Sequence, residues 1–400
     1  MKSKNRYFVL IAGMAIQFCA GIIYMWSVFK GPISNHLNWD ADSAALTSSI
    51  MLAMFVIGII FGGLAQDKFG PKMVTLIGSV LIAIGMACTT LVTESIPWLV
   101  YITYGIVGGL GVGTVYTSTI AAIQKWFSDR RGFASGMIVS AFGFSLVVFA
   151  PLAKSMLGNI GVPGTFLTFG ISFLVICGVC SLFIENPPEG YTPDGYVPMQ
   201  TAGTKRQYSP KEIIKTKQFY LLAGGLIFTL PAYFILNPVF ISLGSVRGLS
   251  EDLALIGVLL TGISSAAGRL IVSWVSDKIG RKAAMIAIAA IILCASLIMI
   301  IGEGVLFLIC IILVSFGFGG AASVYAAMTA ESFGTRYGGM NFGLVMIGFG
   351  VSALAFPIIS NKLTVGGSYT SSFVLAAATC AVAMILVLLM KNPTKSSVKK

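Results

Sequence analysis

Twelve separate runs of about 20 mainly apolar residues constrain this chain more than any other feature. A helix needs about 20 such residues to cross the hydrocarbon core of a bilayer. None of the runs alternates apolar and polar residues with a period of two, which argues against a membrane β-barrel. We therefore predict an all-α, polytopic membrane protein with twelve transmembrane helices. The predicted spans are 7–29, 44–65, 73–93, 98–122, 133–153, 165–184, 219–241, 253–275, 283–302, 304–329, 342–360 and 369–390.

The composition excludes the main classes of soluble protein. Charged residues make up only 10% of the 400 residues, and the mean hydropathy is +0.92, whereas a soluble domain is about 25% charged. The pI near 9.4 therefore does not indicate a nucleic-acid partner. The basic start of the chain imitates a signal peptide, but the long apolar run after it has no cleavage site, and we expect it to stay as the first span.

Residue types that bind metals or carry out catalysis form no cluster in the sequence. His36 is the single histidine, and all seven cysteines fall inside predicted spans, so neither a metal site nor a disulfide framework is indicated. We expect no metal, no cofactor and no enzymatic activity.

The positions of the basic residues predict the orientation of the chain in the membrane. Of the 26 Lys and Arg, 21 fall in the loops on the side of the N-terminus, and four fall on the opposite side. Because loops rich in Lys and Arg stay in the cytoplasm, we expect both termini to be cytoplasmic. We expect a multi-pass monomer in the cytoplasmic membrane of a prokaryotic cell.

The longest hydrophilic stretch divides the chain into two halves. Residues 185–217 are rich in Pro, Gly and charge, as a linker would be. Ser209 followed by Pro210 is typical of a helix start and predicts a short interfacial helix. We predict an N-terminal six-helix bundle at 1–184, a cytoplasmic linker at 185–217 and a C-terminal six-helix bundle at 218–400.

The two halves repeat the same pattern at an offset near 208. Asp67-Lys68-Phe69-Gly70 matches Asp277-Lys278-Ile279-Gly280 at offset 210, and Val115-Tyr116 matches Val324-Tyr325 at offset 209. Phe142-Gly143 matches Phe349-Gly350 at offset 207. Two pseudo-symmetric halves of this kind predict a binding site between them near the middle of the membrane.

The loop after the second span resembles the signature of the major facilitator superfamily, G-x-x-x-D-[RK]-x-G-x-[RK]. It runs from Gly63 to Lys72, and residues 273–282 are a degenerate copy. The resemblance covers the whole chain and implies the twelve-helix fold of that family. It also implies that both loops act as cytoplasmic gating motifs, in which Gly lets two helices approach, Asp caps a helix end and the basic residues hold the loop at the surface. The gating residues are Gly63, Asp67, Lys68, Gly70, Lys72, Asp277, Gly280 and Arg281.

Three further motifs resemble the oxalate/formate antiporter-like family, which is similar to monocarboxylate carriers. They are residues 21–29, the run Lys125 to Gly132, and the run Asn186 to Tyr191. The resemblance implies secondary transport of small organic acids such as oxalate, formate, lactate or pyruvate.

Arg269 is the one ionisable residue that we place inside a span. It lies eight residues before Asp277, which is about 12 Å along a helix and close to the middle of a core about 30 Å thick. A charge there costs at least about 2.5–3.5 kcal/mol. A substrate carboxylate would offset this cost, because guanidinium binds carboxylate through two parallel hydrogen bonds. The family resemblance also implies a substrate-binding Arg in the eighth span.

A single buried cation favours a substrate with one negative charge. Family members that carry oxalate have a second basic residue in span eleven, whereas residues 344–360 contain no Lys, Arg or His. We therefore predict a monocarboxylate, such as lactate, pyruvate or formate. The alternatives are an oxalate/formate-type dicarboxylate antiporter and a drug exporter of the same superfamily, which a positive pocket fits poorly.

The coupling mechanism stays open between proton symport and exchange of one acid for another. Eukaryotic monocarboxylate carriers have an Asp one turn before the Arg, where this chain has Ser265. A proton could still travel with the substrate. Other polar residues at mid-span could contact substrate or simply join helices, and these candidates are Tyr116, Tyr325, Tyr24, Ser265, Asn237 and Gln17.

Overall fold

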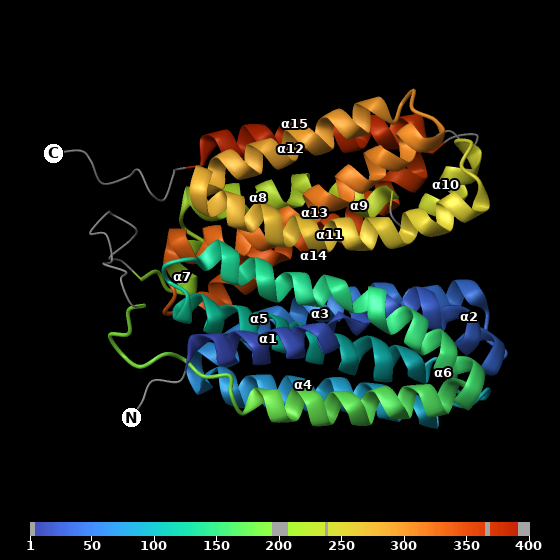
Figure 1. Cartoon of the computed structure of the whole chain (residues 1–400), viewed down its shortest axis with the longest axis horizontal. Coiled ribbons are helices and arrows are strands. Elements are labelled where there is room, and N and C mark those ends of the chain that lie inside the picture. Colours follow the sequence, from blue (N-terminus) through green and yellow to red (C-terminus); the bar gives the residue numbers. More distant parts are fainter. Residues whose placement is uncertain (1–4, 194–206, 237–238, 365–368, 391–400) are drawn as a thin grey trace. The chain divides into compact units, whose positions relative to one another are not determined.

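The computed structural model describes residues 5–193, 207–236, 239–364 and 369–390, and within these ranges every regular element is a helix (Figure 1). Eleven helices are long and apolar enough to cross a membrane. The predicted all-α, polytopic fold is confirmed. The first half contains α1 (Arg6–Ala20), η1 (Gly21–Met25), α2 (Trp26–His36), α3 (Ala41–Phe69), α4 (Pro71–Cys88), η2 (Thr89–Leu91), η3 (Tyr101–Gly108), α5 (Gly109–Trp126) and α6 (Arg131–Ser181). The second half contains α7 (Pro210–Ile213), α8 (Lys217–Thr229), α9 (Pro231–Leu236), α10 (Phe240–Val246), α11 (Glu251–Ile279), α12 (Arg281–Ile298), α13 (Gly304–Phe333), α14 (Gly338–Leu363) and α15 (Thr370–Leu389).

Helix α6 explains why eleven candidate spans accommodate twelve predicted ones. It has 51 residues, so a straight helix would be about 76 Å long, more than twice the thickness of the hydrocarbon core. Gly161 breaks it with a φ of 69°, a backbone conformation that favours glycine. The chain reverses there, and the two arms of α6 are visible in Figure 1. The arms correspond to the predicted spans five and six.

Three other spans contain local departures from the α-helix that the apolar pattern did not predict. The first span continues to His36 and passes through a 3-10 segment, Gly21–Met25, near its middle. The fourth span begins with a π-helix, Tyr101–Gly108. The seventh span is divided at Pro231, which cannot donate a backbone hydrogen bond to the preceding turn.

The residues cluster into two units, and each unit includes one short segment from the other half of the sequence. Unit 1 consists of residues 1–129, 141–196 and 335–343. Unit 2 consists of residues 130–140, 197–334 and 344–400. The first turns of α14 therefore pack within unit 1, and the first turns of α6 pack within unit 2. Both of these segments contain hydrogen-bond partners of the two loop motifs, residues 63–72 and 273–282.

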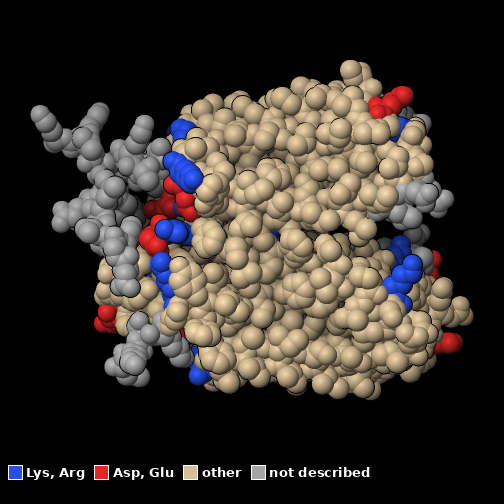
Figure 2. All heavy atoms as spheres, viewed as in Figure 1, with Lys and Arg blue, Asp and Glu red and all other residues tan. Residues whose placement is uncertain are grey.

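The outer faces of the helices are apolar, as contact with lipid requires. Phe61, Ile77 and Ile171 are each more than half exposed, with fractional exposures of 64%, 52% and 55%. Figure 2 shows charged side chains gathered at the ends of the helices and uncharged side chains along their length. Because backbone polar groups are satisfied inside each helix, such a surface is stable in hydrocarbon.

Candidate functional site

Arg269 lies on α11 in unit 2, and only 2% of it is exposed. The backbone around it is held at close range by two glycines. A Cβ added at Gly268 would lie 2.0 Å from the carbonyl oxygen of Phe316, and one added at Gly319 would lie 1.9 Å from that of Ser265. Helices α11 and α13 therefore approach backbone to backbone, as small residues allow in membrane helices. The buried side chain of Arg269 starts directly beside this close contact between the two helices.

The neighbours of α11 also fix the main chain at Arg269. The Ser323 hydroxyl of α13 donates to the carbonyl oxygen of Arg269 at 3.1 Å. In the first turns of α6, the Ser140 hydroxyl donates to the carbonyl oxygen of Ala266 at 2.8 Å. Two helices thus hold the segment from which the guanidinium projects.

An aromatic cluster lies beside the Arg269 side chain. The guanidinium carbon lies over the ring of Phe318, 6.0 Å from its centroid. The Phe318 ring stacks face to face on Tyr233, with centroids 3.7 Å apart and planes 11° from parallel. Phe234 lies edge-on to Phe318 at a centroid distance of 5.5 Å, and Phe349 lies tilted to it at 6.3 Å.

Two other predicted site residues of unit 2 occupy different surroundings. Ser265 is 5% exposed and lies one turn before Arg269; within the described ranges its hydroxyl makes no hydrogen bond. Tyr325 is fully buried on α13, and its hydroxyl lies 3.5 Å from that of Thr229 on α8. The structure thus brings Ser265 and Arg269 to one stretch of α11, whereas Tyr325 contacts α8.

Three predicted site residues meet in unit 1. The Gln17 amide, fully buried on α1, donates to the carbonyl oxygen of Tyr116 at 3.1 Å and to the Thr119 hydroxyl at 2.7 Å. Tyr116 and Tyr24 both pack edge-on against Phe142, at centroid distances of 5.1 and 5.4 Å. Tyr24 lies in the 3-10 segment of span one, where Gly21 approaches the backbone of Phe142.

Asn237 lies outside the described residues. The repeat-related Tyr116 and Tyr325 belong to different units, unit 1 and unit 2.

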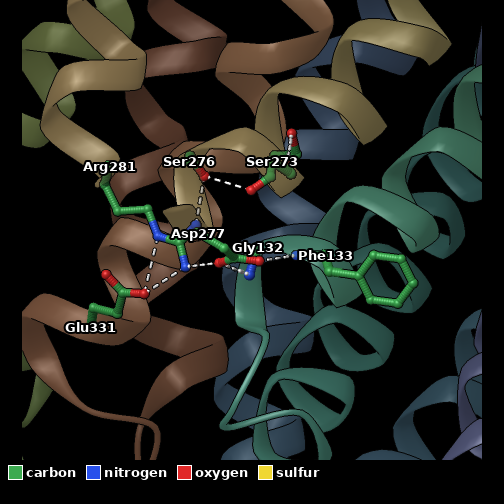
Figure 3. Close-up of polar contacts among 8 residues, drawn as sticks. Gly132, Phe133, Ser273, Ser276, Asp277, Arg281 and Glu331 are labelled. Carbon is green, nitrogen blue, oxygen red and sulfur yellow. Dashed lines mark hydrogen bonds and ion pairs between the residues drawn. The ribbon is translucent and has the colours of Figure 1, made fainter. Parts of the chain in front are cut away.

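The second loop motif, residues 273–282, forms an ion-pair network in unit 2, shown in Figure 3. Asp277, near the end of α11, accepts hydrogen bonds from the backbone N–H groups of Gly132 and Phe133 at 3.1 and 2.8 Å. These groups belong to the first turn of α6, where backbone donors have no partner inside the helix. Arg281 pairs with Asp277 and, at 2.8 Å, with Glu331 of α13. A Cβ at Gly132 would collide with this network.

The first loop motif, residues 63–72, makes the equivalent contact in unit 1. Asp67, near the end of α3, accepts from the backbone N–H groups of Gly339 and Met340 at 3.2 and 2.9 Å. These residues form the first turn of α14. A Cβ at Gly63 would lie 2.3 Å from the carbonyl oxygen of Gly339, so the glycine permits this close approach. Each motif aspartate therefore caps a helix from the opposite half of the sequence.

The turns and basic residues of the two motifs can be compared directly. Gly70 and Gly280 have φ values of 85° and 93°, which allow the tight turns after α3 and α11. Lys68 and Lys72 are exposed at the surface, as expected. Arg281 is not a surface residue: it is 6% exposed and its donors are used in the ion-pair network.

Two of the motifs quoted from the sequence contact each other in unit 1. The Lys125 ammonium donates to the Asn186 side chain at 3.1 Å, and the Trp126 indole N–H donates to the carbonyl oxygen of Glu185 at 2.7 Å. Tyr191 packs on Trp126 with ring centroids 4.9 Å apart. The start of the linker is thus attached to the end of α5.

Several residues of these sites were not singled out from the sequence. Phe318 and Tyr233 beside Arg269, and Glu331 beside Arg281, are the most important. Phe142 and Phe349 are related by the internal repeat and both lie in the aromatic clusters. The repeat could therefore have indicated these two residues. Within the described ranges, no three His, Cys, Asp or Glu side chains lie close enough to bind a metal ion.

Comparisons with known proteins agree with this architecture. The family profile described as Major Facilitator Superfamily matches residues 9–335 and 222–400. The chain is 25% identical over 407 residues to the oxalate:formate antiporter of Oxalobacter formigenes, covering 99% of this chain and 94% of that one. It is 27% identical over 378 residues to monocarboxylate transporter 13 of Rattus norvegicus, covering 92% and 85% of the two chains. Among solved structures, the fucose:proton symporter of Escherichia coli superimposes with a TM-score of 0.72 at 14% identity, covering 95% of this chain and 97% of that one.

Proposed function

Because the chain belongs to the Major Facilitator Superfamily, a family of transporters, we propose that it carries small monocarboxylate anions across the membrane by alternating access. Lactate, pyruvate and formate represent this substrate class. The proposal places the chain in a prokaryotic cytoplasmic membrane with both termini in the cytoplasm.

The buried guanidinium of Arg269 is the observation that carries the proposal. The residue is 2% exposed, and a cation in the middle of a membrane protein is costly and is rarely present without a functional role. Its planar group presents paired N–H donors that match a carboxylate. We assign to Arg269 the role of binding the substrate carboxylate.

Two relatives support small organic anions as the substrate class. One is named for oxalate and formate and the other for monocarboxylates. We favour one negative charge over two, because span eleven lacks a basic residue and the position that matches Arg269 in the first half is Ile59. A dianion would meet one cation instead of two.

We assign to the polar groups near the aromatic clusters the role of binding the parts of the substrate other than its carboxylate. The Ser265 hydroxyl lies one turn from Arg269 and has no hydrogen-bond partner among the described residues. It is a candidate to bind the hydroxyl or keto group of the acid. Tyr116, Tyr24, Gln17, Asn237 and Tyr325 are further candidates.

Uptake of radiolabelled lactate into proteoliposomes tests the proposal. We expect Arg269→Ala to lower uptake at least about 30-fold, because truncating one partner of a buried charge pair costs roughly 2–5 kcal/mol. Arg269→Lys should recover only part of the activity, since Lys lacks the planar fork. Lys362→Ala, which removes an exposed charge, serves as the control.

Competition by unlabelled acids separates the alternatives. Pyruvate and formate should compete with lactate, and oxalate should not. Efficient oxalate transport without competition from lactate, pyruvate or formate would instead favour the dicarboxylate antiporter. Uptake driven by an imposed pH gradient, without internal substrate, would separate proton symport from exchange.

We also propose that Asp67 and Asp277 act as cytoplasmic latches in the transport cycle. Both carboxylates cap the first turn of a helix from the opposite half of the sequence. Such caps are favourable because the N-terminus of a helix carries partial positive charge. The cap geometry supports a role in holding one conformation of the carrier.

A further inference from the structure

We propose that Phe318, backed by Tyr233, is a positioning residue that holds the Arg269 guanidinium in the orientation in which it binds a carboxylate. The inference rests on the proposed function, because it assigns Phe318 a role through Arg269. It adds a specific requirement for an aromatic ring at position 318, on the helix that faces α11.

The first step is the geometry of the stack. Tyr233 covers one face of the Phe318 ring at a centroid distance of 3.7 Å. The guanidinium carbon of Arg269 lies over the same ring at 6.0 Å from its centroid. A cation within about 6 Å of an aromatic face is attracted by the electrons of the ring. With one face occupied by Tyr233, the remaining face is the one available to the guanidinium.

The second step is the rigidity of the platform. Phe318 is 1% exposed, and the rings of Phe234 and Phe349 flank it at 5.5 and 6.3 Å. Phe234 and Phe349 also contact each other edge-on at 5.2 Å. A ring enclosed in this way cannot rotate away from Arg269 without displacing its neighbours.

The third step connects the platform to binding. Arg has a long flexible side chain, and fixing it during binding costs entropy. An aromatic surface that already holds the guanidinium removes part of this cost before the anion arrives. Contact with a ring face uses no N–H donor of the guanidinium. Simple core packing would need only the volume of Phe318, and not its aromatic electrons.

The test compares Phe318→Leu with Phe318→Tyr in lactate uptake. Phe318→Leu keeps an apolar side chain but removes the ring, and it should raise the KM for lactate about tenfold with a maximal rate close to that of wild type. Phe318→Tyr should restore the KM. Phe307→Leu is the matched control, because Phe307 is a fully buried aromatic residue of α13 that packs between Phe240 and Phe373. Its KM should not change. If Phe318→Leu does not fold, Phe318→Met replaces it.

A second readout needs no substrate. The midpoints of thermal unfolding of purified Arg269→Met, Phe318→Leu and the double variant form a cycle, and we expect the two changes to be non-additive. Additive midpoints together with an unchanged KM for Phe318→Leu would overturn the inference. If the cycle is non-additive but the protein takes up no monocarboxylate, the result would support the interaction between Phe318 and Arg269 and would reject the proposed function.

Discussion

Two aspartates, 210 positions apart in the sequence, use the same chemistry in different surroundings. Asp67 and Asp277 each accept two backbone N–H groups from the first turn of a helix. Only Asp277 has an Arg and a Glu beside it, because the positions that match Arg281 and Glu331 in the first half are Pro71 and Ala122. Lys125 instead lies close enough to Asp67 to interact electrostatically.

Removing Arg281 from the Asp277 network should therefore cost more stability than removing Glu331, and the two losses should not add. Glu331→Gln should lower the free energy of unfolding by about 1.5–3 kcal/mol, since it weakens hydrogen bonds to a charged group. Arg281→Met should cost about 3–5 kcal/mol, because it leaves two neighbouring carboxylates without their shared cation. The double variant should cost less than the sum. Unfolding of the purified protein in detergent measures all three, and strict additivity would show that Arg281 and Glu331 act independently.

The sequence could predict that these aspartates cap a helix, because the loop motif is local. It could not identify the capped helix, since Asp67 and Gly339 are brought together only by packing between distant segments. Burial of Arg281 and the stack of Phe318 on Tyr233 depend on distant contacts in the same way. The isolated charge of Arg269 was recognisable because it interrupts an otherwise apolar span.

At the scale of helices, the contact between α11 and α13 depends on the absence of side chains. Gly268→Ala would place a Cβ 2.0 Å from a backbone oxygen, which cannot move as a side chain can. We expect this variant to lose about 3 kcal/mol or more of stability, at the upper end of overpacking effects, and to lose lactate uptake, because Arg269 follows directly. The remaining folded fraction after heating, measured by size-exclusion chromatography, reports the loss.

Gly262→Ala is the matched control on the same helix, because a Cβ there would meet nothing within 4 Å. It should be neutral or stabilising by up to about 1 kcal/mol, since Ala favours the helix more than Gly. Equal stability of the two variants would contradict the close packing of α11 on α13.

Element positions were largely predictable, whereas their irregularities were not. Runs of apolar residues mark the spans because the bilayer imposes the same length on every one. The reversal at Gly161 falls between the predicted spans five and six. The 3-10 segment at Gly21–Met25 and the division at Pro231 lie inside apolar runs. Hydropathy does not detect such irregularities inside a run, because each depends on backbone conformation and not on polarity.

At the scale of the whole molecule, the distribution of charge gives a prediction of orientation. Charged side chains gather at the ends of the helices, and the side chains along their length are uncharged (Figure 2). The loops between the spans should therefore alternate between the two sides of the membrane. Glu94 lies in the exposed loop before the fourth span, and Glu189 lies in the exposed start of the linker. The excess of Lys and Arg predicts that Glu94 is outside and Glu189 is in the cytoplasm.

Single cysteines introduced at these two positions test the orientation. A membrane-impermeant maleimide should label Glu94→Cys on intact cells and should label Glu189→Cys only after the membrane is permeabilised. The unmodified protein is the control, since the native cysteines lie within membrane-spanning helices, where a polar reagent does not enter. The opposite labelling pattern would show that the predicted orientation is inverted. Labelling of both variants on intact cells would show that the two loops lie on the same side of the membrane, so that the number of spans between them is even and not three.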